Sequence, residues 1–106
     1  MHSTLIVAKM NVDDHQHVGD LFSEFDSTDM PSRMGTQRRE LFYFQGLYFH
    51  IQNFAGDNGA DRVENAKRDP RFVGISEDLR PYIEPYDPNW KSPRDAIATP
   101  FYRWTA

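Results

Sequence analysis

The sequence predicts an α+β domain in which helices cover one face of an antiparallel sheet. Three observations lead to this class: a short β-branched run near the start, an amphipathic stripe that follows it, and two aromatic segments separated by a two-residue turn. The 106 residues suffice for one domain, spanning 1–106, which would remove roughly 60 to 70% of the unfolded surface from water.

The first half of the chain predicts a strand and then a helix. Residues 3–10, STLIVAKM, are β-branched with a continuous apolar middle, which indicates a strand buried on both faces. From Asn11 the period changes to that of a helix, and acidic residues at 13 and 14 suit its N-terminus. Its apolar stripe at i, i+3, i+4 and i+7 consists of Val18, Leu21, Phe22 and Phe25. We expect this helix to end near Asp26 and residues 27–31 to form a loop.

The middle of the chain predicts a β-hairpin. Residues 34–44 and 47–54 are aromatic-rich, and only Gln45 and Gly46 separate them. After a turn-rich segment, helical spacing runs over residues 60–67 until Asp69 and Pro70, which we expect to stop that helix.

The last third predicts a second short helix and a final strand. The helix covers residues 76–83, with an apolar stripe that includes Ile75, and prolines beyond it end it. Residues 97–104, IATPFYRW, resemble a strand in which Pro100 indicates an edge or a bulge.

This order of elements, βαββαβ, is the ferredoxin-like pattern, with helices on one face of an antiparallel sheet. The other face of these strands is also apolar and needs a cover. A second copy of the same sheet is the simplest one, so the sequence predicts a homodimer with facing sheets, a dimeric α+β barrel.

Composition excludes several classes of function. The net charge is -4, and no basic run is longer than a pair such as Arg38 and Arg39, so we expect no nucleic-acid partner. There are no cysteines, which excludes disulfides, thiolate metal sites and cysteine nucleophiles. An N-terminal apolar run of four residues is too short for a signal peptide or a membrane span. We therefore expect a cytoplasmic protein with no membrane association.

Ionisable residues inside the aromatic hairpin are the strongest functional signal. Burying such groups without partners costs several kcal/mol, so inward-facing Arg39 and His50 would indicate a pocket. Period two places Tyr48 and His50 on one face, and Arg38 and Arg39 on opposite faces, but parity alone does not say which arginine points inward.

A histidine or arginine in a strand is also commonly structural, and the pattern leaves both interpretations open. Asp26, at the end of the first helix, could orient His50, pair with Arg39 or act as a base. His15 and His17 do not share a helix face, and DNGAD lacks the rest of a calcium loop. We therefore expect no metal, and no nucleotide-cofactor motif is present.

The chain resembles the small tetracenomycin-type aromatic polyketide cyclases. The resemblance lies in STLIVAKM, EFDSTDMP, GTQRRELF with LYFH, DPRF, LRPYIEPYDP and the terminal FYRW, in this order and across nearly the whole chain. It implies a ferredoxin-like homodimer that cyclises and dehydrates poly-β-ketone intermediates without metal or cofactor. An acyl carrier protein is a candidate for delivering that polyketide intermediate.

The resemblance also implies site residues. The family's helix-exit aspartate falls on Asp26, its hairpin arginine on Arg39 and its strand histidine on His50. Where the founding type has a histidine before that aspartate, this chain has Phe25, so a two-histidine relay does not carry over.

A mechanism follows from the chemistry of β-ketones. His50 would remove an acidic methylene proton, Arg39 would stabilise the oxyanion, and the imidazolium would assist loss of water. Holding the flexible chain in an aromatic-lined cavity would supply part of the catalysis. The candidate lining residues, each also explained by core packing, are Phe22, Phe25, Tyr48, Phe101 and Trp104.

Two other functions fit the same fold. A cofactor-free, quinone-forming monooxygenase would need oxygen, whereas a cyclase would not. A non-catalytic accessory subunit of a polyketide synthase would tolerate loss of Arg39 and His50 together.

Overall fold

The computed structural model describes residues 2–56, 65–91 and 93–106. Within these ranges it contains a four-stranded sheet of β1 (His2–Met10), β2 (Thr36–Phe44), β3 (Leu47–Phe54) and β4 (Ile83–Pro85), in the order β2-β3-β1-β4. All neighbouring strands are antiparallel. This order is that of the predicted ferredoxin-like fold. Because β3 lies between β1 and β2, its side chains lie in the interior of the sheet and not at its edge.

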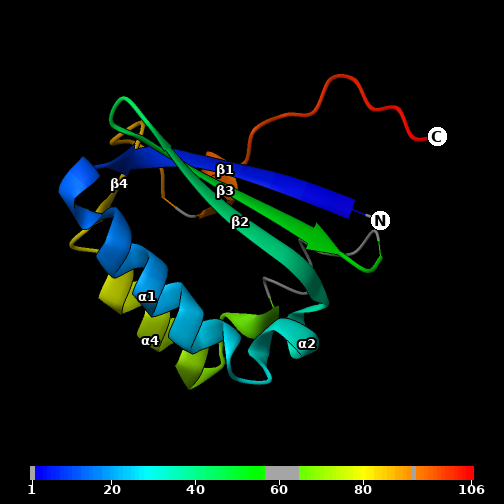
Figure 1. The fold of residues 1–106 in the computed structure, drawn as a ribbon, viewed down its shortest axis with the longest axis horizontal. Coiled ribbons are helices and arrows are strands. Elements are labelled where there is room, and N and C mark those ends of the chain that lie inside the picture. The colour runs from blue at the N-terminus through cyan, green and yellow to red at the C-terminus, as the bar shows by residue number, and fades with distance from the viewer. Residues whose placement is uncertain (1, 57–64, 92) are drawn as a thin grey trace.

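One face of this sheet is covered, as Figure 1 shows, by helices that include α1 (His15–Asp26), α2 (Met30–Met34) and α4 (Pro70–Leu79). Val18 and Phe22 of α1 pack in one core cluster with Ala8, Met10 and Tyr48 of the sheet. A second cluster joins the end of α1 to α2 and consists of Phe25, Met30 and Met34. The two clusters place the last turns of α1 directly over the hairpin.

The first strand and first helix are confirmed, but the middle of β1 is half-buried and not buried on both faces as expected. A short 3-10 turn (Val12–Asp14) precedes α1, and the Asn11 side chain accepts a hydrogen bond from the Asp13 amide, which caps this turn. The expected loop over 27–31 is wrong in its second half, because α2 begins at Met30. Pro31 fits in the first turn of a helix, where a missing N–H costs no hydrogen bond.

The hairpin is confirmed, with strands that begin at Thr36 and end at Phe54. Gly35 is not part of it: with φ of 75° it is the left-handed C-cap of α2. Gln45 and Gly46 both have positive φ, 49° and 84°, which is the geometry of a two-residue hairpin turn whose twist matches the strands.

A register shift at the start of β2 interrupts the alternation of inward and outward side chains along this strand. Thr36 pairs with Phe54 and Arg38 with Asn53, so Gln37 is the extra residue of a bulge. Alternation alone would place Gln37 on the same face as Arg39. Because of the bulge, Thr36 takes the inward place instead, and Gln37 is exposed.

The expected helices of the second half have different bounds. Most of the predicted helix over 60–67 lies outside the described residues. Asp69 and Pro70, expected to stop that helix, instead begin α4: Asp69 accepts from the Arg71 amide as N-cap, and Pro70 stands in the first turn. The predicted helix over 76–83 is correct only for residues 76–79, since α4 ends at Leu79 and Ile83 belongs to β4.

The predicted final strand over 97–104 is also wrong. The fourth strand is β4, which pairs with the end of β1, and after a 3-10 turn (Pro93–Ala96) only Ile97 forms a bridge, to Ile6. Residues 98–106 have no regular structure, and Figure 1 shows this tail leaving the sheet on the side away from the helices. Pro100 lacks the amide hydrogen that a strand there would need.

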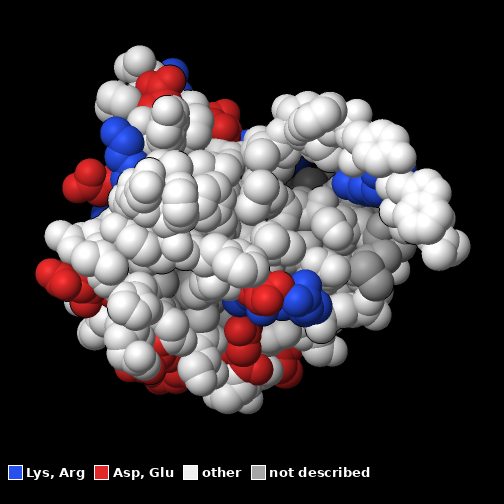
Figure 2. Space-filling view, turned by 45° about the horizontal axis from the view of Figure 1, so that its top comes forward, with Lys and Arg blue, Asp and Glu red and all other residues white. Residues whose placement is uncertain are grey.

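The other sheet face has no helix over it among the described residues. Phe42 and Phe44 of β2 lie there and are 48% and 60% exposed. Figure 2, turned so that the side away from the helices comes forward, shows mostly uncharged side chains over much of it. None of the described helices is long and apolar enough to cross a membrane.

Candidate active site

Three residues singled out from the sequence meet on the helix-covered face of the sheet. His50 of β3 lies opposite Leu41, and Arg39 of β2 lies opposite Gln52, so the two side chains are neighbours on adjacent strands. Asp26 is the last residue of α1, whose C-terminal turns lie over this part of the hairpin. The fold thus brings together groups that are 11 and 13 residues apart along the chain.

Arg39 is the centre of this cluster. Its Nε lies 3.1 Å from Oδ1 and 3.0 Å from Oδ2 of Asp26, and its Nη1 lies 2.8 Å from Nε2 of His50. Asp26 therefore pairs with Arg39, which is one of the three roles the sequence left open for it. The Arg39 side chain is only 7% exposed, whereas that of Asp26 is 35% exposed, so one end of the pair is dry and the other reaches water.

Aromatic rings surround the guanidinium. Its central carbon lies 5.0 Å from the ring centre of Phe22 and 5.7 Å from that of Phe25, both from α1. These distances are within the range of cation–π contacts. Phe25, a predicted lining residue, therefore contacts Arg39.

One nitrogen of Arg39 is left without a partner. Nη2 is buried, and no described residue accepts a hydrogen bond from it. An unpaired buried donor costs about 1 to 3 kcal/mol, and more on a charged group. Such an atom suits a ligand oxygen, because binding would supply the missing acceptor.

His50 is 5% exposed and sits between two donors. Besides Arg39, the side-chain nitrogen of Gln52 lies 3.1 Å from Nε2 of His50. Burial first, and the positive charge of Arg39 second, lower the pKa of His50 to about 3. The imidazole is therefore neutral at pH 7.

Tyr48 and Phe22 enclose the imidazole with apolar surface. The ring of Phe22 lies 5.1 Å from that of His50 at 65°, and the ring of Tyr48 lies 6.1 Å away at 66°, both edge-on. Burial raises the pKa of Tyr48 above its ordinary value, so its phenol is neutral too. The local surroundings of Arg39 and His50 are thus aromatic and of low polarity.

The remaining predicted lining residues lie elsewhere in this chain. Phe101 and Trp104 are on the C-terminal tail and are 97% and 72% exposed, so within one chain they do not enclose the Arg39 cluster. Arg38 points to the opposite sheet face and pairs with exposed Glu40. The structure therefore decides which of the two adjacent arginines faces inward.

Sequence reasoning missed Gln52 and Thr36. Gln52 is 6% exposed, and Thr36 Oγ1 lies 3.4 Å from its side-chain oxygen. Gln52 could have been found, because period two places it on the same face as Tyr48 and His50. Thr36 could not, because its inward position depends on the bulge.

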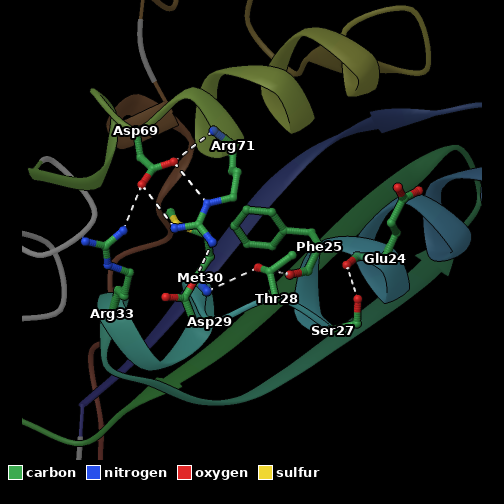
Figure 3. Close-up of polar contacts among 9 residues, drawn as sticks. All are labelled: Glu24, Phe25, Ser27, Thr28, Asp29, Met30, Arg33, Asp69 and Arg71. Carbon is green, nitrogen blue, oxygen red and sulfur yellow. Dashed lines mark hydrogen bonds and ion pairs between the residues drawn. The ribbon is translucent and has the colours of Figure 1, made fainter.

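The segment that follows Asp26 is fixed by its own hydrogen bonds, shown in Figure 3. Ser27 and Thr28 donate to the carbonyls of Glu24 and Phe25, at 2.6 and 2.7 Å, and so satisfy free acceptors at the end of α1. The Met30 amide donates to Thr28 Oγ1 at 3.1 Å, which links this turn to α2. These contacts set the direction in which α1 ends, and hence the place of Asp26.

Ion pairs then tie α2 to the start of α4. Arg71 contacts Asp29 and Asp69, and Arg33 Nη1 lies 3.2 Å from Asp69 Oδ2 (Figure 3). We call these four residues the ion-pair corner. The DPRF segment, one of the segments that carry the family resemblance, supplies two of them.

A separate hollow of about 420 Å³ lies at the other end of the sheet, beside the hairpin turn, and none of the predicted site residues lines it. Its lining includes Lys9, Asp14, Tyr82 and Glu84. No group of three or more histidine, aspartate or glutamate side chains in the described ranges could hold a metal ion. The Arg39 cluster is thus the candidate site that the geometry supports.

The comparisons with known proteins show the family of this chain. The family model described as polyketide synthesis cyclase matches residues 2–105. The chain belongs to this family. The relatives that match this chain are similar to it over nearly their whole lengths, so the similarity is not confined to one motif.

Relatives of the chain come from Streptomyces. Tetracenomycin F2 cyclase of Streptomyces glaucescens is 36% identical over 105 residues, which are 99% of this chain and 95% of that protein. Polyketide synthase CurG of Streptomyces cyaneus is 37% identical over 105 residues, 98% of this chain and 97% of CurG. The resemblance to tetracenomycin-type cyclases is thereby confirmed.

Solved structures give the same result. The structure of tetracenomycin F2 cyclase, described as a type-II polyketide cyclase, has a TM-score of 0.93, with 35% identity, and the match covers 100% of this chain and 99% of that one. An antibiotic biosynthesis monooxygenase matches with a TM-score of 0.51 at 12% identity, over 77% of this chain and 86% of that one. That second likeness shows a shared fold alone.

Proposed function

We propose that this protein is a cytoplasmic type II aromatic polyketide cyclase. It would catalyse intramolecular aldol cyclisation and dehydration of a poly-β-ketone or of a partly cyclised intermediate. The observation that carries the proposal is the unpaired Nη2 of Arg39, a buried cationic donor surrounded by aromatic rings. A neutral polyketide rich in carbonyl oxygens supplies the acceptor that this donor lacks, and its flat rings suit the aromatic surroundings.

Arg39 would stabilise the negative charge that develops on oxygen. Removing a proton between two carbonyls gives an enolate, and its attack on a second carbonyl carbon forms the new C–C bond and an alkoxide. A preorganised donor in a dry site typically contributes 10²–10³-fold to such a step. The low exposure of Arg39 provides that dry setting.

The hydrogen-bond pattern leads us to assign proton removal to Asp26 rather than to His50. Both donors near His50 converge on Nε2, and the lowered pKa makes the neutral imidazole a weak base. The Asp26 carboxylate is partly exposed and keeps lone pairs free after pairing with Arg39. It would take the methylene proton and return it to the alkoxide, and in the dehydration it would take a second α-proton and return it to the hydroxyl that leaves as water, while His50 holds Arg39 in place.

Substrate folding would supply the remaining catalysis. Phe22, Phe25 and Tyr48 enclose the cluster from one chain. In a homodimer with facing sheets, the uncovered face with Phe42 and Phe44 would be buried, and the tail with Phe101 and Trp104 would lie against the second copy. Exposed apolar area of this kind commonly marks an interface. Sedimentation analysis of the protein, with Phe44→Asp as the disrupted variant, tests this arrangement.

The decisive experiment reconstitutes a minimal polyketide synthase, including its acyl carrier protein, with and without this protein. We expect the protein to convert a mixture of shunt products into one ring pattern, and Arg39→Met to restore the mixture. An identical shunt mixture with and without the protein would overturn the proposal.

The same assay separates two other functions. Run without oxygen, it gives the same product if the protein is a cyclase and none if it is a monooxygenase that adds an oxygen atom. A double variant, Arg39→Ala with His50→Ala, that folds and still directs the wild-type ring pattern would instead indicate an accessory subunit.

A further inference from the structure

Gln52 is the buried polar residue whose role the proposed chemistry leaves unexplained. It lies directly opposite Arg39 in the ladder and two residues beyond His50, so all three side chains share the inward face. Its side chain is buried, and a polar group in such a place is retained only with partners. Its two partners are His50 on one side and Thr36 on the other.

The contact between Arg39 and His50 shows which imidazole nitrogen carries the hydrogen. A guanidinium nitrogen only donates, and Nη1 lies 2.8 Å from Nε2 of His50. Nε2 must therefore be the acceptor. Because the imidazole is neutral, its one hydrogen is then on Nδ1.

The orientation of the Gln52 amide follows from the same reasoning. With Nε2 of His50 as an acceptor, Gln52 must present its NH₂ group to it, at 3.1 Å. Its carbonyl oxygen is then turned toward Thr36, whose hydroxyl donates at 3.4 Å. A chain of donors thus runs from Thr36 through Gln52 to His50, and it exists because the bulge at Gln37 brings Thr36 to the inward face.

We propose that Gln52, held by Thr36, is a positioning residue that fixes His50 as the Nδ1-protonated tautomer, so that Nε2 holds Nη1 of Arg39 and Nη2 stays free for substrate. If Nε2 carried the hydrogen, two donors would face each other, the hydrogen bond from Nη1 of Arg39 would be lost, and the guanidinium would rotate away from this position. The role in catalysis rests on the proposed function, whereas the tautomer itself does not.

The groups that face His50 support this assignment. Among the described residues, β2 supplies Arg39, α1 supplies the ring of Phe22 and, through Arg39, the carboxylate of Asp26, and β3 supplies the neutral phenol of Tyr48. The partner of His50 on β1 is apolar Ile6. No carboxylate among these contacts the imidazole directly, so nothing there draws its hydrogen to Nε2.

Nitrogen NMR of the histidine-labelled protein, without substrate, tests the tautomer. At pH 7 we expect a hydrogen on Nδ1 of His50 and none on Nε2. Gln52→Glu replaces the donor with an acceptor, so we expect hydrogens on both nitrogens and a pKa of His50 raised by more than one unit. The matched control is Gln37→Glu, which adds the same charge at the exposed bulge and should leave the spectrum unchanged.

A hydrogen on Nε2 in the unmodified protein would overturn the inference, as would identical His50 spectra for Gln52→Glu and Gln37→Glu. Should Gln52→Glu fail to fold, the pair Thr36→Val and Thr36→Ser carries the test. Loss of the hydroxyl lets the Gln52 amide turn, so a second tautomer should appear in the first variant and not in the second.

The reconstituted synthase tests the positioning role. We expect Gln52→Leu to lower kcat about tenfold with KM nearly unchanged, as for residues that support a catalytic group. An unchanged kcat in a folded Gln52→Leu variant with an altered His50 spectrum would refute the positioning role. Absence of any product change with the unmodified protein would instead refute the proposed function, and the tautomer would still stand or fall by NMR.

Discussion

Two sets of arginine–aspartate contacts in this molecule differ in how much water reaches them. In the candidate site, the Arg39 side chain is 7% exposed and one of its nitrogens has no partner. In the ion-pair corner, the Arg71 side chain is 40% exposed and contacts two aspartates. The residue types are the same, but only the first set combines desolvation with a free donor.

This difference separates a structural role from a chemical one. At the exposed corner, water screens the charges and competes for each hydrogen bond, so the pairs orient α2 and α4 without storing much energy. Around Arg39 the aromatic rings exclude water, and each electrostatic interaction is correspondingly stronger. Variants of the candidate site should therefore lose activity, variants of the ion-pair corner should keep it, and both should keep the fold.

The largest expected effect comes from Arg39→Met. It removes the oxyanion donor and should lower the rate of ring closure about 10³-fold, measured as product formed by the reconstituted synthase. An apolar side chain in these surroundings should keep the protein folded. Arg38→Met, on the same strand and the opposite face, is the matched control and should be fully active. Equal activities of the two variants would contradict the comparison.

Asp26→Asn should have the next largest effect. The amide can still accept from Arg39 but cannot take up the substrate proton, so kcat should fall about 10²-fold. Asp20→Asn, a change of the same kind on an exposed turn of α1, should be without effect on kcat. Near-wild-type kcat in Asp26→Asn would return the role of base to His50.

His50 predicts a pH dependence of stability. Its pKa is lowered from 6.5 to about 3, so below pH 6.5 the unfolded chain binds a proton that the folded chain does not. The free energy of unfolding is therefore highest above pH 6.5 and should fall by about 2 kcal/mol between pH 6.5 and 5.

Urea unfolding at several pH values measures this slope. His50→Gln should abolish most of it, whereas the exposed His17→Gln should retain it. A slope that persists in His50→Gln would show that other groups cause it.

The ion-pair corner should give the smallest effect. Hydrogen bonds from Arg71 hold the pKa of Asp69 and of Asp29 below the ordinary value of 3.8, so its contribution exists above that pH and is lost as the pH falls further. We expect Arg71→Gln to lower the Tm slightly at pH 7. At pH 2 or in high salt, the Tm of the variant should equal that of the unmodified protein. The ring pattern of the product should be unchanged. A changed ring pattern would show that the corner does more than orient helices.

Sequence patterns predicted correctly those elements that depend on residues close together in the chain, and failed for elements that depend on tertiary packing. The first strand, α1 and the hairpin follow from period and turn residues, and all are confirmed. Asp69 and Pro70 were misassigned because the same pair can follow one helix or begin the next, and only the packing of α4 beside α1 distinguishes these cases. The fourth strand was misplaced because a three-residue strand such as β4 carries almost no periodic signal.

The sequence by itself determined that Tyr48, His50 and Gln52 share one face of a strand and that Arg38 and Arg39 take opposite faces, since side chains alternate along any strand. It also supplied Asp26 at a helix end. Only the tertiary structure decided that Arg39 is the buried arginine, that Asp26 pairs with it, and that Thr36 faces inward. The alternation of side chains along a strand does not say which face is buried, because that depends on where α1 packs. A bulge shifts the alternation by one residue, and it can be recognised only from the pairing with the neighbouring strand.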